Sequence, residues 1–322
     1  MRYKCTVAYE GAAYCGWQRQ RNGRSVQGVI EEALAGISNE GIRIAGAGRT
    51  DAGVNAAGQV FHFDSRMEIS AAKWRGAINS RLPEDIRVIN VEAVDDLFHA
   101  RYGVRRKQYD YRIHTGGYDV FSRNTAYQCP YPIVVERMKD AAEVFVGRHD
   151  FAAFCSNSFA ETPDQVRTVE DIRFLEEGNL LTISYTGAGF LRYMVRMMTG
   201  ALLECGRGRL SKEEIHSLLE GKSKDTMRWN APACGLTLVK IEYFGILAAD
   251  RDTMIRETVP EDNAPEECRY VFLQKKTQQV LGWIADNGVW TVAEEGMPSA
   301  QALLPVLRQH HPEMIVMIEN EH

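Results

Sequence analysis

The sequence predicts an α+β protein with two similar α/β halves and mainly antiparallel sheets. Three observations lead to this class. Stretches with the two-residue period of half-buried strands recur along the chain, apolar stretches with helical spacing separate them, and the order of elements up to residue 115 returns loosely in the later part. A chain of 322 residues, with 45% hydrophobic and 25% charged residues, can form more than one packed unit.

The first half is assigned to residues 1–105 and is expected to follow the order strand, helix, strand, strand, helix, strand. Its first strand is clear, because Tyr3, Cys5, Val7 and Tyr9 alternate with more polar residues. Serines that precede apolar stretches are placed to cap both helices. The expected ranges are strand 2–9, helix 26–37, strands 42–45 and 59–63, helix 71–79 and strand 86–93, with a bridging strand at 108–114.

The second half, residues 106–247, repeats this order loosely. We expect helix 134–145, strands 166–174 and 180–185, helices 190–204 and 211–219, and strand 236–243. A charged stretch with two prolines and no sustained periodicity indicates a linker at 248–269. Residues 270–322 form a small C-terminal extension of unknown role, with strands expected at 270–273, 289–292 and 314–318 and helices near 277–285 and 299–310.

The net charge of -5 is unevenly distributed along the chain. Residues 246–322 carry 13 acidic and 6 basic side chains, so the preceding residues hold 32 basic and 30 acidic ones. Basic residues cluster in this preceding part, at Arg19, Arg21 and Arg24 and again at Arg101, Arg105, Arg106 and Lys107. Such local clusters determine binding to phosphate groups more than the total charge does, although a solvated surface is the plainer interpretation of any one cluster.

The composition also bounds the compartment and the cofactors. No run approaches the roughly 18 apolar residues that span a bilayer, and the residues after Met1 lack the apolar segment of a signal peptide, so we expect a cytoplasmic protein without a membrane partner. Seven cysteines are scattered without a C-x-x-C pair. This favours reduced packing residues over disulfides, and no metal site is expected.

A glycine-rich segment contains the first candidate for chemistry. Glycines at 46, 48 and 53 allow a sharp turn that would present the carboxylate of Asp51 at the floor of a site. By itself, this pattern is more typical of a hydrogen-bonding turn residue than of a nucleophile. The glycine spacing matches neither a dinucleotide-binding motif nor a P-loop, so no nucleotide cofactor is predicted.

The segment 47–54, with sequence AGRTDAGV, resembles the signature of the tRNA pseudouridine synthase A (TruA) family. Further family-like segments follow in the family's order: YCGWQRQ at 14–20, SVQ at 25–27, GQVFHF at 58–63, FHAR at 98–101 and FLRYMVR at 190–196. The resemblance covers about residues 2–243, and the C-terminal 77 residues have no counterpart in it. One departure is Asn55, where the family usually has His four residues after the Asp.

The resemblance implies a pseudouridine synthase fold whose halves flank a basic cleft, a homodimer that binds tRNA, and no metal or organic cofactor. It implies that Asp51 is the nucleophile that isomerises uridine to pseudouridine at positions 38, 39 and 40 of the anticodon stem-loop. Arg196 would hold Asp51 ionised, Tyr109 would stack on the extruded base, and Arg49 would fill the space that the base leaves. Contacts to the tRNA are expected from Trp17, Arg19, Arg21, Phe98, Arg101, Tyr102 and Arg192.

Plainer interpretations and two alternative functions stay open. Without the resemblance, Tyr109 and Tyr111 are typical packing residues of a strand, and Arg192 and Arg196 would be a surface pair on one face of the expected helix. An RNA-binding or tRNA-folding protein with little catalysis is favoured by Asn55 and by the acidic C-terminal stretch. Hydrolysis of a nucleoside or glycoside would need a second carboxylate near Asp51, and the adjoining sequence offers none.

Overall fold

The structure is a computed structural model that describes residues 1–94, 98–101, 104–160, 162–221 and 229–243, together with four strands beyond residue 269. The chain divides into two compact units, Met1–Glu242 and Tyr243–His322. The boundaries expected at residues 105, 247 and 269 remain predictions.

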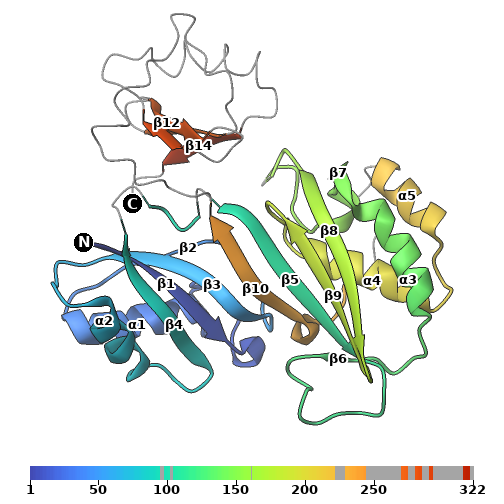
Figure 1. Cartoon of the computed structure of the whole chain (residues 1–322), viewed down its shortest axis with the longest axis horizontal. Helices are drawn as coiled ribbons and strands as arrows, with labels where there is room; N and C mark the ends of the chain where they lie inside the picture. Colours follow the sequence, from blue (N-terminus) through green and yellow to red (C-terminus); the bar gives the residue numbers. More distant parts are fainter. Residues whose placement is uncertain are drawn as a thin grey trace, which may run out of the picture. The chain divides into compact units, whose positions relative to one another are not determined.

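The first unit is built on one ten-stranded sheet, whose main path has the order β4-β1-β3-β10-β5-β9-β8-β7 (Figure 1). Off this path, β2 pairs with β3 and β6 pairs with β5. The strands are β1 Arg2–Tyr9, β2 Ala45–Gly46, β3 Asn55–Asp64, β4 Ile86–Val94, β5 Val104–His114, β6 Tyr127–Gln128, β7 Gly147–Asp150, β8 Val166–Glu177, β9 Leu180–Gly187 and β10 Leu236–Tyr243.

Five α-helices among the described residues accompany this sheet. Figure 1 shows α1 and α2 beside β1, β3 and β4, and α3, α4 and α5 beside β7, β8 and β9. The helices are α1 Val26–Ser38, α2 Ala71–Asn79, α3 Val135–Ala142, α4 Met194–Gly206 and α5 Lys212–Gly221. Short 3-10 turns are η1 Gly11–Ala13, η2 Glu143–Phe145, η3 Ala152–Phe154 and η4 Ala233–Gly235.

The predicted serine caps begin both helices of the first half. The Ser25 hydroxyl accepts a hydrogen bond from the Gly28 N–H at 3.2 Å, and the Ser70 hydroxyl accepts one from the Lys73 N–H at 3.4 Å. Each hydroxyl satisfies a donor that has no partner within the first helical turn. None of the described helices is both long and apolar enough to cross a membrane.

Strand β10 joins the two halves into a single sheet. It comes from the second half of the chain but lies between β3 and β5, and it runs parallel to β3 with Thr237 opposite Asn55 and Leu238 opposite Ala56. The segments that precede β3 and β10 therefore meet at the same end of the sheet. The other pairs resolved along the main path are antiparallel, which confirms the α+β class with mainly antiparallel pairing.

Two predicted elements of the first unit need correction. In the strand expected at 42–45, only Ala45 pairs, because the Ile44 N–H bonds to the Glu31 carboxylate at 3.2 Å and its carbonyl accepts from Gln27 at 3.3 Å. The helix expected at 190–204 begins only at Met194, because Tyr193 has a left-handed backbone with φ of 65°. Arg192 and Arg196 consequently do not share a helix face.

The second unit contains a four-stranded sheet in the order β13-β12-β11-β14. Its strands are β11 Tyr270–Gln274, β12 Val280–Ile284, β13 Trp290–Val292 and β14 Ile315–Glu319. The prediction of a helix at 277–285 is wrong, since β12 pairs antiparallel with β11, and its β-branched and aromatic residues suit a strand. The helix expected at 299–310 lies outside the described residues.

Candidate active site

The turn that carries Asp51 connects β2 to β3 and is held from several sides. The Thr50 carbonyl accepts a hydrogen bond from the Trp17 N–H at 3.1 Å, and the Thr50 hydroxyl bonds the Tyr9 hydroxyl at 2.8 Å. Gly16 has a φ of 100°, and a Cβ there would lie 2.6 Å from the Thr50 carbonyl oxygen. The loop after β1 therefore fixes the backbone beside the carboxylate.

Arg196 meets Asp51 across the sheet. Its Nη1 lies 3.5 Å from the Asp51 Oδ2, and the two side chains are 13% and 22% exposed. The Arg196 Nε donates to the Ala231 carbonyl at 2.8 Å, which leaves the outer edge of the guanidinium facing the carboxylate. The pair predicted from the sequence thus exists at contact distance, in a site that solvent reaches only partly.

Two opposing effects act on the pKa of Asp51. Burial is the largest effect and raises the pKa, while the charge and hydrogen bond of Arg196 and the charge of Arg192 lower it. The net direction is upward. An ionised carboxylate at neutral pH consequently depends on these two cations, as expected for a nucleophile.

Tyr109 lies in β5 and contributes a buried ring to the same site. It is 8% exposed, and its ring meets that of Phe190 edge to face at a centroid distance of 5.4 Å. Burial raises its pKa, followed by the effects of Tyr9 and Asp51, so the hydroxyl stays protonated and can donate a hydrogen bond. Tyr111, two residues along the strand, is fully buried and donates to the Pro232 carbonyl at 2.8 Å, which makes it a packing residue.

Tyr193 organises the two arginines around the start of α4. Its ring has the guanidinium carbons of Arg192 and Arg196 at 5.1 Å and 5.0 Å from its centroid. Both distances lie within the range of cation–π attraction. Tyr193 has a left-handed backbone, and Arg192 lies before the start of α4, yet its guanidinium still reaches this ring. Arg192 and Arg196 therefore come together at Tyr193, and not on one face of the helix predicted at 190–204.

Three further cations lie close to the catalytic turn. Burial and the charges of Arg101 and Arg192 lower the pKa of Arg49. The Lys107 ammonium donates to the Ala47 carbonyl at 3.0 Å, and burial, then the charge of Arg101, lowers its pKa to about 8. Arg49, Arg101 and Lys107 therefore concentrate positive charge around the segment that leads to Asp51, which favours binding of a phosphate backbone.

Two of the expected RNA contacts are buried in the structure. Trp17 is 3% exposed and packs against Phe61 and Tyr9, and a Cβ on Gly46 would lie 2.4 Å from its indole nitrogen. Phe98 is 5% exposed and meets His62 edge to face. Their rings lie in the core and do not present a surface to RNA. Tyr102 lies outside the described residues.

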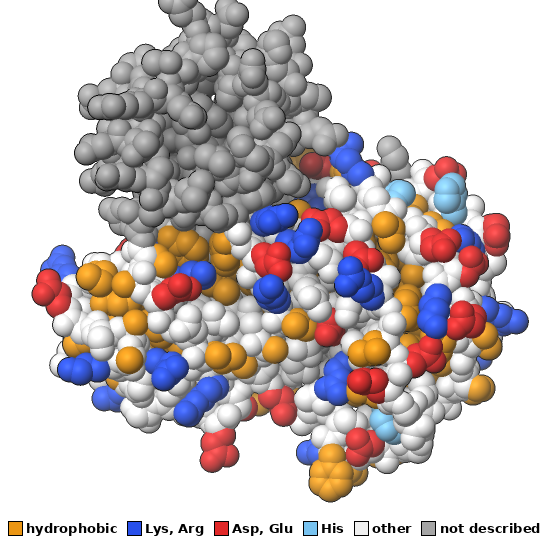
Figure 2. Space-filling view, in the orientation of Figure 1, with side chains coloured by type: hydrophobic (Ala, Val, Ile, Leu, Met, Phe, Trp, Pro, Cys, Tyr) orange, Lys and Arg blue, Asp and Glu red, His pale blue; other side chains and the backbone are white. Residues whose placement is uncertain are grey.

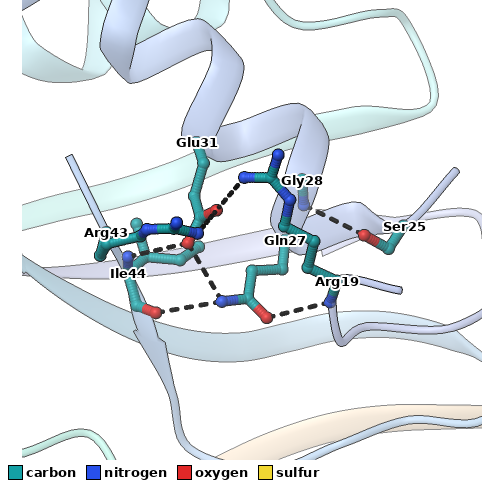
Figure 3. Close-up of polar contacts among 7 residues, drawn as sticks. All are labelled: Arg19, Ser25, Gln27, Gly28, Glu31, Arg43 and Ile44. Atoms are coloured by element: carbon teal, nitrogen blue, oxygen red, sulfur yellow. Dashed lines mark hydrogen bonds and ion pairs between the residues drawn. The ribbon is translucent and has the colours of Figure 1, made fainter. Parts of the chain in front are cut away.

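Arg19 is exposed, and its guanidinium is held by Glu31 of α1 (Figure 3). It contacts the buried carboxylate of Glu31 at 3.2 Å, and Arg43 contacts the same oxygen at 3.4 Å. The second oxygen accepts from Gln27 and from the Ile44 N–H. Arg19 thus offers a fixed cation on the loop that also supports the catalytic turn.

The sequence did not single out Phe190 or Tyr193 as site residues. Lys107 belonged to the predicted basic cluster, and it lies two residues before Tyr109 in a strand, so the two side chains point to the same face. The positions of Phe190 and Tyr193 depend on the left-handed turn at Tyr193, which the residue types in this segment do not predict. Among the described residues, no group of three His, Cys, Asp or Glu side chains is placed to hold a metal ion.

Comparisons with known proteins show the family of this chain. The sequence profile of a family described as tRNA pseudouridine synthase matches residues 6–103 and 141–244. The tRNA pseudouridine synthase A of Bacillus licheniformis is 42% identical over 246 residues, which cover 76% of this chain and 99% of that protein. The proteins of the same name from Bacillus subtilis and Anoxybacillus flavithermus are 42% and 41% identical, and they are covered over 99% and 98% of their lengths. The family expected from segment 47–54 is confirmed: the chain belongs to the tRNA pseudouridine synthase family.

Proposed function

We propose that this chain isomerises uridine to pseudouridine at positions 38, 39 and 40 of the tRNA anticodon stem-loop, with Asp51 as the nucleophile. The contact between Asp51 and Arg196 beside the buried Tyr109 is the observation that carries the proposal. Family membership supports it, since the relatives named above are tRNA pseudouridine synthases A.

In the proposed reaction, the Asp51 carboxylate bonds to the target nucleoside and the N1–C1′ glycosidic bond breaks. The uracil then rejoins the ribose through C5, C5 loses its proton, N1 gains a proton in place of its bond to C1′, and the carboxylate is released, so atoms and electrons balance without a co-reactant. Tyr109 stacks on the extruded base and offers its protonated hydroxyl for hydrogen bonding. Extrusion costs a few kcal/mol, which contacts between Arg49 and the opened stack offset.

Binding of the tRNA relies on the cations around the catalytic turn. Arg101 and Arg192 are assigned to phosphate groups near the target nucleotide, and Arg19 to the backbone farther along the loop 14–25. Trp17 and Phe98 act by supporting the turn and the neighbouring strand from the core. A homodimer that grips one tRNA, acting in the cytoplasm, completes the proposal, and light scattering of the full chain tests the dimer.

The test is pseudouridine formation in an unmodified tRNA with uridines at 38, 39 and 40. The intact chain is expected to convert them, whereas Asp51→Asn and Asp51→Ala are expected to bind the tRNA without converting it. Asp64→Asn is the matched control, because Asp64 is a 61% exposed carboxylate that pairs with Arg2 outside the site. Turnover by Asp51→Ala would refute the assignment of the nucleophile.

The alternative of an RNA-binding protein with little catalysis makes a different prediction. It expects the intact chain and both Asp51 variants to bind the tRNA equally and none of them to form pseudouridine. The hydrolase alternative lacks support, because the charged groups that shift the pKa of Asp51 are both arginines within the described part of the chain. Release of free uracil would revive it.

A further inference from the structure

We infer that Asn55 is a positioning residue that sets the separation between the Asp51 carboxylate and the Arg196 guanidinium. The inference deepens the proposed function and rests on it. Asn55 is the first residue of β3, four residues after Asp51, and it is only 4% exposed. The hydrogen bonds of its side chain go to main-chain groups and not to Asp51, Tyr109 or Arg196.

The amide of Asn55 ties together three segments that are distant in sequence. Its Oδ1 accepts a hydrogen bond from the Gly11 N–H at 2.8 Å, and its Nδ2 donates to the carbonyls of Asn124 at 2.9 Å and Cys234 at 3.1 Å. Both amide hydrogens and the amide oxygen are therefore used. A buried side chain with this set of bonds fixes the positions of its neighbours, because leaving any of them unpaired is costly.

The Cys234 segment also holds Arg196. Ala231, three residues before Cys234, accepts from the Arg196 Nε at 2.8 Å and donates its N–H to the Arg196 carbonyl at 3.0 Å. On the same segment, the Ala233 methyl group lies 3.2 Å from the position of a Cβ on Gly53 in the catalytic turn. The segment 231–235 is therefore hydrogen-bonded to Arg196 through Ala231 and packs against the Asp51 turn through Ala233.

These contacts close a frame around the catalytic pair. The backbone connects Asp51 to Asn55, and the Asn55 side chain is hydrogen-bonded to the Cys234 carbonyl. The backbone then connects Cys234 to Ala231, which is hydrogen-bonded to Arg196, and Arg196 contacts Asp51. The direct contact between Arg196 and Asp51 is 3.5 Å long and is a weak restraint by itself. The shorter bonds of the frame consequently determine how far apart the two charges lie.

The experiment compares the intact chain with Asn55→Ala in steady-state pseudouridine formation. Loss of the amide frees the turn from the Cys234 segment, so kcat is expected to fall by roughly 10- to 100-fold, the effect of a displacement of about 1 Å. KM is expected to change less than threefold, because the cations that bind phosphate are not attached to Asn55. The value of kcat is calculated per mole of folded protein, and an unchanged kcat would contradict the inference.

The pH profile supplies a readout that a merely structural role would not change. Among the described residues, the charged and titratable groups that act on Asp51 or feel its charge are Arg192 just before α4, Arg196 within α4 and Tyr109 from β5. If Asn55→Ala increases the separation from Arg196, burial of Asp51 is opposed less strongly. The acid limb of kcat/KM is then expected to move to higher pH.

Asn79→Ala is the matched control. The Asn79 amide makes two bonds of 2.8 Å to the N–H and carbonyl of Val88, between α2 and β4, and does not touch the site. This variant is expected to lose stability while keeping kcat and the acid limb of the intact chain. The inference is overturned if Asn55→Ala behaves in the same way as Asn79→Ala.

Asn55→His decides the question if the alanine variant does not fold. A neutral imidazole has one acceptor and one donor, so it can keep the bond from Gly11 and one of the two carbonyls. We expect a kcat between that of the intact chain and that of a variant in which all three side-chain bonds are lost. The acid limb of kcat/KM is expected at a higher pH than in the intact chain. An unchanged kcat and pH profile would overturn the inference. Inactivity of the intact chain would instead contradict the proposed function.

Discussion

At the residue scale, the chemistry depends on how burial and two arginines compete over one carboxylate. Burial favours the neutral form of Asp51, whereas Arg196 and Arg192 favour the ionised form. Because the proposed attack requires the ionised form, activity is expected to disappear as the pH falls through the pKa of Asp51. The raised pKa places this loss at a higher pH than for an ordinary aspartate.

Arg196→Ala tests this balance. Removing the guanidinium leaves burial less opposed, so the acid limb of kcat/KM is expected to move to higher pH and the plateau to fall by roughly 100-fold. Arg207→Ala provides the control, since Arg207 pairs with Glu204 at 2.6 Å near the other end of α4. Profiles of Arg196→Ala and the intact chain that superimpose would show that Arg196 does not control the ionisation of Asp51.

Lys107 predicts a second pH effect, on RNA binding. Burial and Arg101 lower its pKa to about 8, so its charge is present below that pH and disappears as the pH rises through it. The intact chain is expected to lose tRNA affinity between pH 7 and pH 9 by a few-fold, whereas Lys107→Met should bind more weakly at pH 7 and show a flatter dependence. Filter binding at constant ionic strength measures this, with the exposed Lys139→Met as the control.

At the element scale, the loop after β1 determines where the catalytic turn lies. Gly16 adopts a φ of 100°. A Cβ at this position would lie only 2.6 Å from the Thr50 carbonyl oxygen, so the absence of a side chain leaves room for that carbonyl. The same loop uses the Trp17 N–H to bond Thr50. The turn between β2 and β3 is therefore shaped from outside as well as by its own glycines.

Gly16→Ala is expected to destabilise the fold by about 1–3 kcal/mol and to lower kcat, because the methyl group and the unfavourable φ displace Thr50 and Asp51 together. Thermal unfolding and steady-state kinetics measure the two effects. Gly41→Ala is the matched control, since a Cβ at Gly41 meets nothing within 4 Å. Equal effects of the two substitutions would contradict the role of Gly16.

At the scale of the whole molecule, the face shown in Figure 2 has no broad area of a single charge: Lys and Arg side chains are interspersed with Asp and Glu over the described residues. Residues 246–322, with 13 acidic and 6 basic side chains, add an acidic segment that the matched family profile, which ends at residue 244, does not include.

Removal of the acidic segment is predicted to tighten tRNA binding. If residues after Ala248 compete with RNA for the cations of the first unit, a chain that ends there should bind tRNA more tightly at low salt, and the difference should shrink as salt screens the charges. Affinity measured at several salt concentrations tests this. Equal affinities of the long and short chains at low salt would exclude competition by the segment.

Much of the fold was predictable because local patterns agree with the final structure. The alternation over β1 and the serine caps of α1 and α2 gave these elements nearly at their observed ends. The same patterns failed where backbone groups found partners elsewhere, as at Ile44, which bonds to Glu31 and Gln27 and not to a neighbouring strand. In β12, pairing with β11 overrode the helix expected from the sequence.

The sequence by itself determined the family and the α+β class, and it predicted Asp51, Tyr109 and Arg196 as site residues, because these inferences follow from short segments of defined residue types. Only the tertiary structure decided how they meet. Insertion of β10 between β3 and β5 brings the segment that clamps Arg196 beside the turn that carries Asp51, although they are about 180 residues apart. The burial of Trp17 and Phe98 and the turn at Tyr193 were likewise decided there, since burial and long-range pairing depend on every element that packs around a residue.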